Sequence, residues 1–420
     1  MSMSANREVL RLRGFRLLLA SRFLSGVGLQ MHNVAVGWFV YDLTNSAWAL
    51  GLVGLFAFTP AFAFALFTGH VADRYDRRTI VATAHTVTAA GAFALLLYAW
   101  SGHPQVWPVY VIVLAVGTGR AFGNPAGQAL LPNLVPKEHL GPAVALSAAV
   151  GQVATVSGPA IGGFLYVFGP MVVFGAEASA FALAALLVFL IGRQNATRPK
   201  EKVTLATLLA GLTFIRSRPV VLGAISLDLA AVILGGATAL LPIFARDILQ
   251  VGPVGLGILR SAPAVGALCI GLWLARFPLR GRVGRRMLQS VAIFGLATIA
   301  FGLSTSVYLS ILALAVIGAA DMVSVVIRQT LVQIETPDDM RGRVSAVNTI
   351  FIGASNELGG FESGALAALT SPVFSVVFGG TATLGVVALW SGLFPQLRNR
   401  DQMIEPAPVR REPTDAPGHG

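Results

Sequence analysis

Several ionisable residues of this sequence lie within long apolar stretches, where a charge is costly. Asp228, Glu357 and Glu362 fall deepest in such stretches, and Arg120 lies in another. A charge at the centre of a membrane helix costs about 2.5–3.5 kcal/mol on insertion scales, so it usually faces a cavity or a partner. A carboxyl group in a cavity of low dielectric constant can bind a proton near neutral pH and release it when its surroundings change. The three acids are therefore candidates for proton coupling, and the alternative for each is a structural ion pair with Arg120 or Arg260.

The spacing of the acids limits which of them can face a central cavity. Glu357 and Glu362 are five positions apart, which is about 140° around a helix, so at most one of them points squarely into a central cavity. We favour Glu362 of the three acids. Asp321 and Arg328 are seven positions apart and share a helix face. Asp321 and Glu177 are the next acids to consider if the first three prove unimportant.

Polar residues of the first apolar stretch form a second candidate set. Gln30, His32 and Asn33 lie close together there, and with Arg120 they are the candidates for lining a substrate pathway. His85 fits a helix interface better. A single histidine on an apolar helix face is weak evidence for a substrate pathway.

These residues need elements that hold them within a membrane. Between its charge clusters the chain has twelve apolar stretches, each near the ~20 residues that a helix needs to cross a bilayer. The predicted fold is an all-α polytopic membrane protein with twelve transmembrane helices in two pseudo-symmetric six-helix bundles. The predicted spans are 15–40, 47–68, 80–100, 106–127, 142–167, 171–192, 219–243, 255–275, 287–305, 307–328, 344–369 and 372–395.

Positive charge is distributed very unevenly among the connections between these spans. Of the 30 Lys and Arg residues, 27 fall on one side if the N-terminus is cytoplasmic, and only Arg120, Arg246 and Arg260 lie elsewhere. Basic loop residues stay on the side that does not translocate. We therefore expect a multi-pass protein of the cell (inner) membrane with both termini in the cytoplasm.

Composition excludes several other classes. The mean hydropathy of +0.74 and the charged fraction of 12% are far from those of a soluble domain, where about a quarter of residues are charged. The net charge of +11 lies in short loops, so we expect anionic lipid headgroups beside it and no nucleic acid. The single cysteine, Cys269, offers neither a disulfide framework nor a metal cluster. The first span lacks a small-residue cleavage pattern, so we expect it to be retained.

The chain divides into two similar halves. We predict a first bundle over 1–192, a cytoplasmic linker with an interfacial helix over 193–218, a second bundle over 219–397 and a disordered cytoplasmic tail over 398–420. Segment 128–146 aligns with 329–347 at an offset of 201 residues, and Gly158 and Gly163 then lie over Gly359 and Gly364. One offset that persists across several loops indicates duplicated halves, as in one large transporter class.

The loop after the second span carries a recognisable motif. Residues 69–80, GHVADRYDRRTI, closely resemble the G-x-x-x-D-R-x-x-R-R/K signature of the major facilitator superfamily. The resemblance implies a gate, in which the Asp73 carboxylate lies near the N-terminus of the eleventh span, where the helix dipole stabilises an anion. The alternative is a solvated turn that fixes topology. The gate residues are Gly69, Asp73, Arg74, Arg77 and Arg78.

The fifth span carries a second motif. VSGPAIGGFL, residues 156–165, resembles the G-P-x-x-G-G element of exporters in this superfamily. The four antiporter-like residues are Gly158, Pro159, Gly162 and Gly163. Gly158 and Gly162 form a small-xxx-small pair that permits close helix approach, and Pro159 removes a backbone donor. Ordinary helix packing is the alternative interpretation.

Further segments narrow the resemblance. They are GWFVYDLTNSAWALGLVG (37–54), GRAFGNPAGQALLPNLVP (119–136), GLTFIRSRP (211–219), DDMRGRVSAV (338–347) and SNELGGFESG (355–364). Together they resemble the transmembrane secretion effector branch, which contains the enterobactin exporter and drug-efflux proteins. In this resemblance Arg120 stands at the position of the family's span-four arginine.

We therefore expect a secondary transporter that exports a small amphipathic molecule, either drug-like or a siderophore. The resemblance implies proton antiport by alternating access, with the small molecule, protons and the bilayer as partners. One alternative is a dedicated siderophore or lipid translocase with a single substrate. A remote alternative is an intramembrane hydrolase. The sequence shows no phosphate-binding loop, metal-ligand spacing or nucleophile with a supporting base, so we expect neither a cofactor nor an enzyme.

Overall fold

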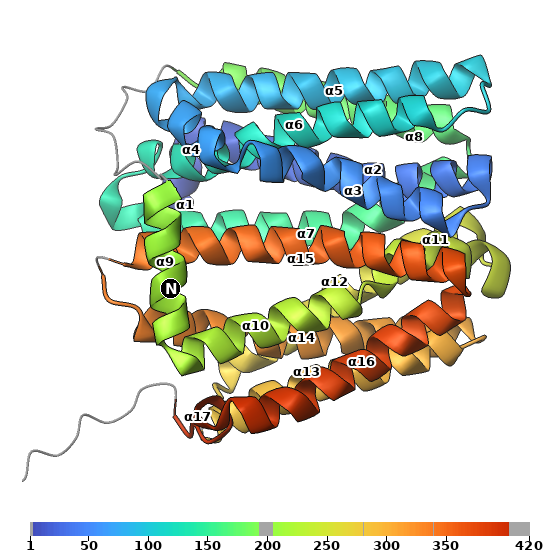
Figure 1. The fold of residues 1–420 in the computed structure, drawn as a ribbon. Helices are drawn as coiled ribbons and strands as arrows, with labels where there is room; N and C mark the ends of the chain where they lie inside the picture. Colours follow the sequence, from blue (N-terminus) through green and yellow to red (C-terminus); the bar gives the residue numbers. More distant parts are fainter. Residues whose placement is uncertain (1–2, 193–204, 280, 339, 403–420) are drawn as a thin grey trace, which may run out of the picture.

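The computed structural model describes residues 3–192, 205–279, 281–338 and 340–402, which are helical apart from short connections (Figure 1). Most helices lie side by side along one direction. The helices of the first half are α1 (Met3–Arg11), α2 (Arg13–Thr44), α3 (Ala47–Ala63), α4 (Ala65–Arg74), α5 (Arg77–Ser101), α6 (Trp107–Leu130), η1 (Leu131–Asn133), η2 (Lys137–His139), α7 (Leu140–Tyr166) and α8 (Pro170–Phe189).

The second half follows a separate helix, α9 (Leu205–Ser217). Its first membrane segment is broken into α10 (Pro219–Leu234), η3 (Ala237–Leu240), α11 (Leu241–Ile243) and the π-helix η4 (Phe244–Ile248). The next five are long single helices, α12 (Gly252–Arg276), α13 (Val283–Leu303), α14 (Val307–Glu335), α15 (Arg341–Leu369) and α16 (Pro372–Leu393). The short helix α17 (Pro395–Arg398) follows them.

The predicted spans all fall on helical structure. Within the described residues, eight helical segments are long and apolar enough to cross a membrane, and Ala47–Ala63 is a shorter apolar helix. This result is compatible with twelve spans. The prediction of an all-helical membrane fold is confirmed.

The span limits differ from the predicted ones in two ways. Several helices continue past the apolar stretch, as α14 does to Glu335, because helix geometry needs no apolar residue once the chain leaves the bilayer. The predicted spans 47–68 and 219–243 are interrupted at Phe64 and after Leu234. Pro60 lies just before the first break and removes a backbone donor. At the second break Gly236 lies against the backbone of α15 at Gly359.

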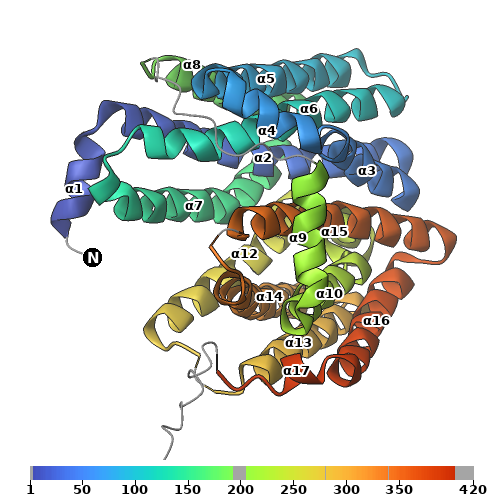
Figure 2. The ribbon, with the colours of Figure 1, turned by 60° about the vertical axis from the view of Figure 1, so that its left-hand side comes forward.

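The helices pack as two groups, one from each half, as Figure 2 shows with the blue-to-green helices above the yellow-to-red ones. In the first group α2 packs against α7 and α8, and α5 against α6 and α8. In the second group α13 packs against α14 and α16, and α10 against α15 and α16. The main contacts between the groups are α3 with α15 and α7 with α12.

Equivalent glycines occupy equivalent places in the two halves. A Cβ atom on Gly158 would stand 2.6 Å from the Gln30 side chain of α2, and one on Gly359 would stand 3.1 Å from Ile233 Cα of α10. These glycines are related by the 201-residue offset, and each lets the fifth helix of its half approach the first. The duplication seen in the sequence therefore has a counterpart in the packing.

Two further glycine pairs join the halves to each other. A Cβ atom on Gly364 of α15 would stand 2.7 Å from Gly51 Cα of α3, and one on Gly163 of α7 would stand 3.0 Å from Gly257 Cα of α12. Any side chain at these points would push the two backbones apart. Small residues at helix crossings allow such close approach.

Helix α9 crosses one end of the molecule at a steep angle to the other helices (Figures 1 and 2). It packs on α15 and α10, and Gly211 lies against the backbone of Arg343. It lies within the segment where the sequence predicts a linker with an interfacial helix, and the interfacial role stays a prediction. Residues 193–204 and 403–420, which carry the rest of the predicted linker and most of the tail, lie outside the described residues.

Candidate functional site

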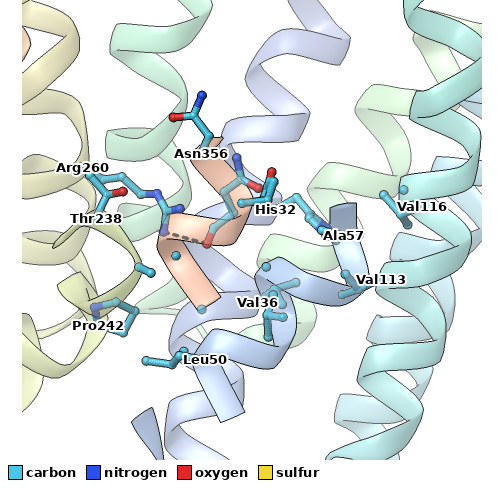
Figure 3. Close-up of a pocket in the computed structure, with 18 of the residues that line it drawn as sticks. His32, Val36, Leu50, Ala57, Val113, Val116, Thr238, Pro242, Arg260 and Asn356 are labelled. Atoms are coloured by element: carbon cyan, nitrogen blue, oxygen red, sulfur yellow. Dashed lines mark hydrogen bonds between the residues drawn. The ribbon is translucent and has the colours of Figure 1, made fainter. Parts of the chain in front are cut away.

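A cavity of about 130 Å³ lies between the two halves. Figure 3 shows its walls, to which both halves contribute. We call it the central cavity. Its lining residues are His32, Asn33, Val36 and Gly37 of α2, Leu50, Val53, Gly54 and Ala57 of α3, Val113, Val116, Gly117 and Arg120 of α6, Thr238, Ala239 and Pro242 of η3 and α11, Arg260 of α12, and Asn356, Glu357 and Gly360 of α15.

Three charged side chains line this cavity, and we call them the cavity cluster: Arg120, Arg260 and Glu357. Glu357 interacts electrostatically with both arginines. Arg260 Nη1 also donates a hydrogen bond across the halves to the backbone oxygen of Asn33, at 3.1 Å (Figure 3). Arg120 Nε is buried and has no hydrogen-bond partner among the described residues. The cluster holds two guanidinium groups and one carboxylate.

A second cavity of about 290 Å³ adjoins the first within the first half. Arg120 lines both. The second cavity is also lined by Arg22 and His85. Arg22 Nη2 donates to the backbone oxygen of Gly127 at 2.7 Å, and Arg22 Nη1 donates to Ser147 Oγ. These bonds hold the Arg22 side chain between α2, α6 and α7.

The second half contains a separate buried group, which we call the C-half cluster: Asp228, Asp321 and Arg328. Arg328 Nη2 lies 3.3 Å from Asp228 Oδ2, and both side chains are buried. Arg328 also interacts electrostatically with Asp321. A space of about 10 Å³ is lined by Asp228, Asp321 and Ser324, and Ser324 Oγ has no partner among the described residues. Two carboxylates here share one guanidinium.

His32 is fixed by a buried acid of its own half. His32 Nδ1 lies 2.9 Å from Glu177 Oε1 of α8, and Glu177 is fully buried. His32 therefore lines the central cavity and is held in place by its contact with Glu177. Gln30 does not line the cavity in the described structure, and its Oε1 accepts a hydrogen bond from Asn33 Nδ2 at 3.3 Å. Its position suits orienting Asn33 better than contacting a substrate.

The predicted coupling acids lie in three different surroundings. Asp228 belongs to the C-half cluster and Glu357 to the cavity cluster. Glu362 is half-buried, and its Oε2 accepts a hydrogen bond from Ser363 Oγ at 3.4 Å. It is not among the described residues that line the central cavity. Of the partners expected for a structural acid, Arg120 and Arg260 suit Glu357, whereas the partner of Asp228 is Arg328.

Two arginines of the gate motif tie the first half together. Arg78 Nη1 donates to the backbone oxygen of Ile191 at 2.7 Å, and its guanidinium lies 5.4 Å from the centre of the Phe189 ring. Arg77 Nη1 donates to the backbone oxygen of Ala129 at 3.3 Å. The described contacts of both arginines anchor α5 to α6 and to the end of α8.

The remaining gate residues lie on α4. The backbone of Asp73 and Arg74 forms the last turn of this helix, and Gly69 has no neighbouring atom near its Cβ direction. The side chain of Asp73 lies outside the part of the chain that the structure describes. The predicted gate role of this carboxylate therefore stays a prediction.

The antiporter-like motif lies on α7 where this helix contacts both α2 of its own half and α12 of the other half. Gly158 and Gly162 pack against α2 at Gln30 and Met31, whereas Gly163 faces Gly257 of α12. Pro159 is buried inside α7. This segment thus joins the first helix of its own half to the other half.

Polar contacts join the two halves at the end of the molecule opposite α9 (Figure 1). Arg246 Nη1 lies 3.3 Å from Asp42 Oδ1, and its guanidinium lies 5.5 Å from the Tyr41 ring centre. The Tyr41 hydroxyl donates a hydrogen bond to Asp247. These contacts join α2 to the π-helix η4 and therefore join the halves.

Part of this arrangement was not predicted from the sequence. Arg22 is one of the 27 basic residues that the topology argument places on the cytoplasmic side, and it also lines the second cavity. Arg260 was expected only as a partner for acids, but it also lines the central cavity. Both are arginines within or beside apolar spans, and that position was the available signal.

Comparison with known proteins places this fold in a family. The family model described as transmembrane secretion effector matches residues 6–414. The enterobactin exporter EntS of Shigella boydii is 30% identical over 386 residues, covering 91% of this chain and 92% of that protein. EntS of Escherichia coli strain K12 is 29% identical over 387 residues, covering 92% of each chain.

Solved structures agree on the fold. A mutant of the nucleoside transporter NupG superposes with a TM-score of 0.74 at 14% identity, covering 91% of this chain and 100% of that one. The POT family transporter PepTSo also superposes with a TM-score of 0.74, at 13% identity, covering 92% and 98%. The family model that matches residues 6–414, together with the EntS relatives, shows that this chain belongs to the transmembrane secretion effector family of the major facilitator superfamily.

Proposed function

We propose that this protein is a secondary active transporter that exports a small amphipathic compound, of siderophore or drug type, across the cell membrane. The observation that carries the proposal is the central cavity, which both halves line and which combines charged with apolar walls. Secondary transporters bind substrate at such an interface and expose it to each side in turn. Relatives named as enterobactin exporters support export as the direction.

We further propose that both termini lie in the cytoplasm. The basic residues of the loops support this orientation, and anionic headgroups are their expected neighbours. The end at which the Asp42–Arg246 ion pair and the Tyr41–Asp247 hydrogen bond join the halves then faces outward. Opening to the outside requires these contacts to break, and Asp73 would act at the other end as part of the gate.

The proposed energy source is the proton gradient. Asp228, Glu357 and Glu362 stay the candidates, and the contacts favour Asp228. Near Arg328, the carboxylates of Asp228 and Asp321 compete for one guanidinium. A proton can then serve as the missing counter-charge of one carboxylate, and its loss changes the interaction between α10 and α14. We propose that the compound itself undergoes no chemical change.

Everted membrane vesicles with an inward-acid pH gradient test this function. Vesicles containing the protein should accumulate labelled enterobactin, or a compound from a drug panel, above vesicles without it. Accumulation should collapse when a protonophore removes the gradient. Accumulation of enterobactin alone would favour a dedicated exporter, and accumulation of several drugs a broad one. No gradient-dependent accumulation of any compound would contradict the proposal.

A further inference from the structure

Arginines outnumber acids among the described residues that line the central cavity and the second cavity. Arg120 and Arg260 line the central cavity, where Glu357 is the one carboxylate among the described lining residues. Arg22 and Arg120 line the second cavity, and no Asp or Glu is among its described lining residues. Buried charges in an apolar bundle need partners of opposite sign. The cavities therefore have positive charge that the surrounding described side chains do not balance.

The arginine shared by both cavities has bonding capacity left. Arg120 Nε is buried without a hydrogen-bond partner among the described residues. A guanidinium has five N–H donors in a planar fork, which matches the two oxygens of a carboxylate or a phosphate. Arg260 uses its Nη1 for the Asn33 backbone oxygen. The two arginines come from different halves, so an anion between them would contact both halves at once.

Glu357 marks the place of such an anion. Its carboxylate is the group whose charge acts on both Arg120 and Arg260. It belongs to α15, a helix that packs across the interface against α3. We infer that the exported compound carries an acidic group that binds Arg120 and Arg260 in competition with the Glu357 carboxylate. The inference rests on the proposed function and names the chemical class of its substrate.

The rest of the compound faces an apolar wall. Val36, Leu50, Val113 and Val116 line the central cavity (Figure 3), and Phe181 lines the second. An aromatic or aliphatic body fits these walls, since burial of apolar surface favours it. A cationic compound would instead meet two guanidinium groups. The substrate class is thus an amphipathic acid.

Binding of a matched pair of small probes tests this assignment directly. Benzoate and benzylamine have nearly the same size and apolar body, but opposite charges at neutral pH. Equilibrium dialysis of labelled probes against the purified full-length protein, corrected for empty micelles, should show benzoate binding about tenfold tighter than benzylamine.

Substitutions should then shift benzoate affinity in opposite directions. Arg120→Gln and Arg260→Gln should each weaken benzoate binding by about tenfold, because each removes one charged donor. Glu357→Gln should strengthen it several-fold, because a competing carboxylate is lost. The matched control is Arg276→Gln, an exposed arginine at the end of α12, which removes the same charge away from the cavities. Thermal unfolding and size-exclusion profiles confirm that each variant is folded.

Several results would overturn the inference. They are failure of benzoate to bind, tighter binding of benzylamine, and unchanged benzoate affinity in both folded cavity variants. Loss of benzylamine binding in Glu357→Gln would show that this acid holds a cation instead. These are binding measurements, so they are separate from the vesicle test. A vesicle assay that finds export of cations alone would refute the inference and leave the transporter function standing.

Discussion

The cavity cluster and the C-half cluster are both built from arginines and acids, but they differ in the sign of their net charge and in the size of the space beside them. Arg120, Arg260 and Glu357 carry an excess positive charge beside a cavity of about 130 Å³. The C-half cluster carries an excess negative charge beside a space of about 10 Å³. A space of that size holds at most about one water molecule. One cluster is therefore suited to a solute and the other to nothing larger than water or a proton.

The clusters also differ in what they connect. Arg260 of the second half donates to Asn33 of the first, so the cavity cluster spans the interface that must rearrange during transport. The pair formed by Asp228 and Arg328 lies wholly within the second half. We expect changes in the cavity cluster to alter substrate binding. We expect changes in the C-half cluster to alter the stability of the protein and its use of the proton gradient. The predictions below test this division, from the largest expected effect to the smallest.

Loss of Arg328 should be the most damaging change. Arg328→Gln leaves Asp228 and Asp321 without their guanidinium, and breaking a buried pair costs about 3–5 kcal/mol. Thermal unfolding should therefore show a large loss of stability, much of which Asp228→Asn in the same chain restores. Arg260→Gln should lower the stability clearly less, because Arg260 lines the central cavity. Equal losses in the two single variants would remove the distinction between the clusters.

Proton-driven accumulation should depend on the C-half cluster. Asp228→Asn should abolish accumulation driven by a pH gradient in liposomes and retain downhill exchange, because the carboxylate that binds the proton is gone. Glu357→Gln and Glu362→Gln should both keep accumulation. Accumulation lost in either of these two and kept in Asp228→Asn would place coupling elsewhere. Full proton-driven transport in all three would turn attention to Asp321 and Glu177.

The gate motif provides a test independent of both clusters. Asp73→Asn should slow transport strongly and leave membrane insertion intact, since one loop charge matters little to the apolar spans. Benzoate affinity should stay at the wild-type value, because the role proposed for Asp73 is in the gate and not in binding the substrate. The control is Asp76→Asn, at the N-cap of α5, which removes a nearby negative charge while asparagine caps a helix about as well as aspartate. A wild-type transport rate in Asp73→Asn would reduce the motif to a topology signal.

Orientation decides from which compartment each cluster is reached, and its test perturbs the protein least. In a Cys269→Ser background, Ser101→Cys and Gln250→Cys should both be labelled in intact cells by an impermeant thiol reagent. Ser101 is the last residue of α5, and Gln250 follows η4. Ser2→Cys should stay unlabelled. The reverse pattern would invert the topology and the direction of the proposed cycle.

The sequence predicted the helices better than the partners of their charges. Apolar length alone located the spans, because the requirement for about twenty apolar residues is local. The pairing of Asp228 with Arg328 depends on how α10 packs against α14, which no local pattern records. The shared face of Asp321 and Arg328 was predictable from their spacing. Our preference for Glu362 rested on a motif, and its described surroundings give that preference no support.

The two glycine pairs between the halves have a mechanical consequence. Gly51 with Gly364 and Gly163 with Gly257 bring backbone against backbone at two separate places. At both places the distance between the halves is set by backbone contact and not by the volume of side chains. A bulky residue at one pair alone should therefore push the halves apart on that side and tilt one half on the other.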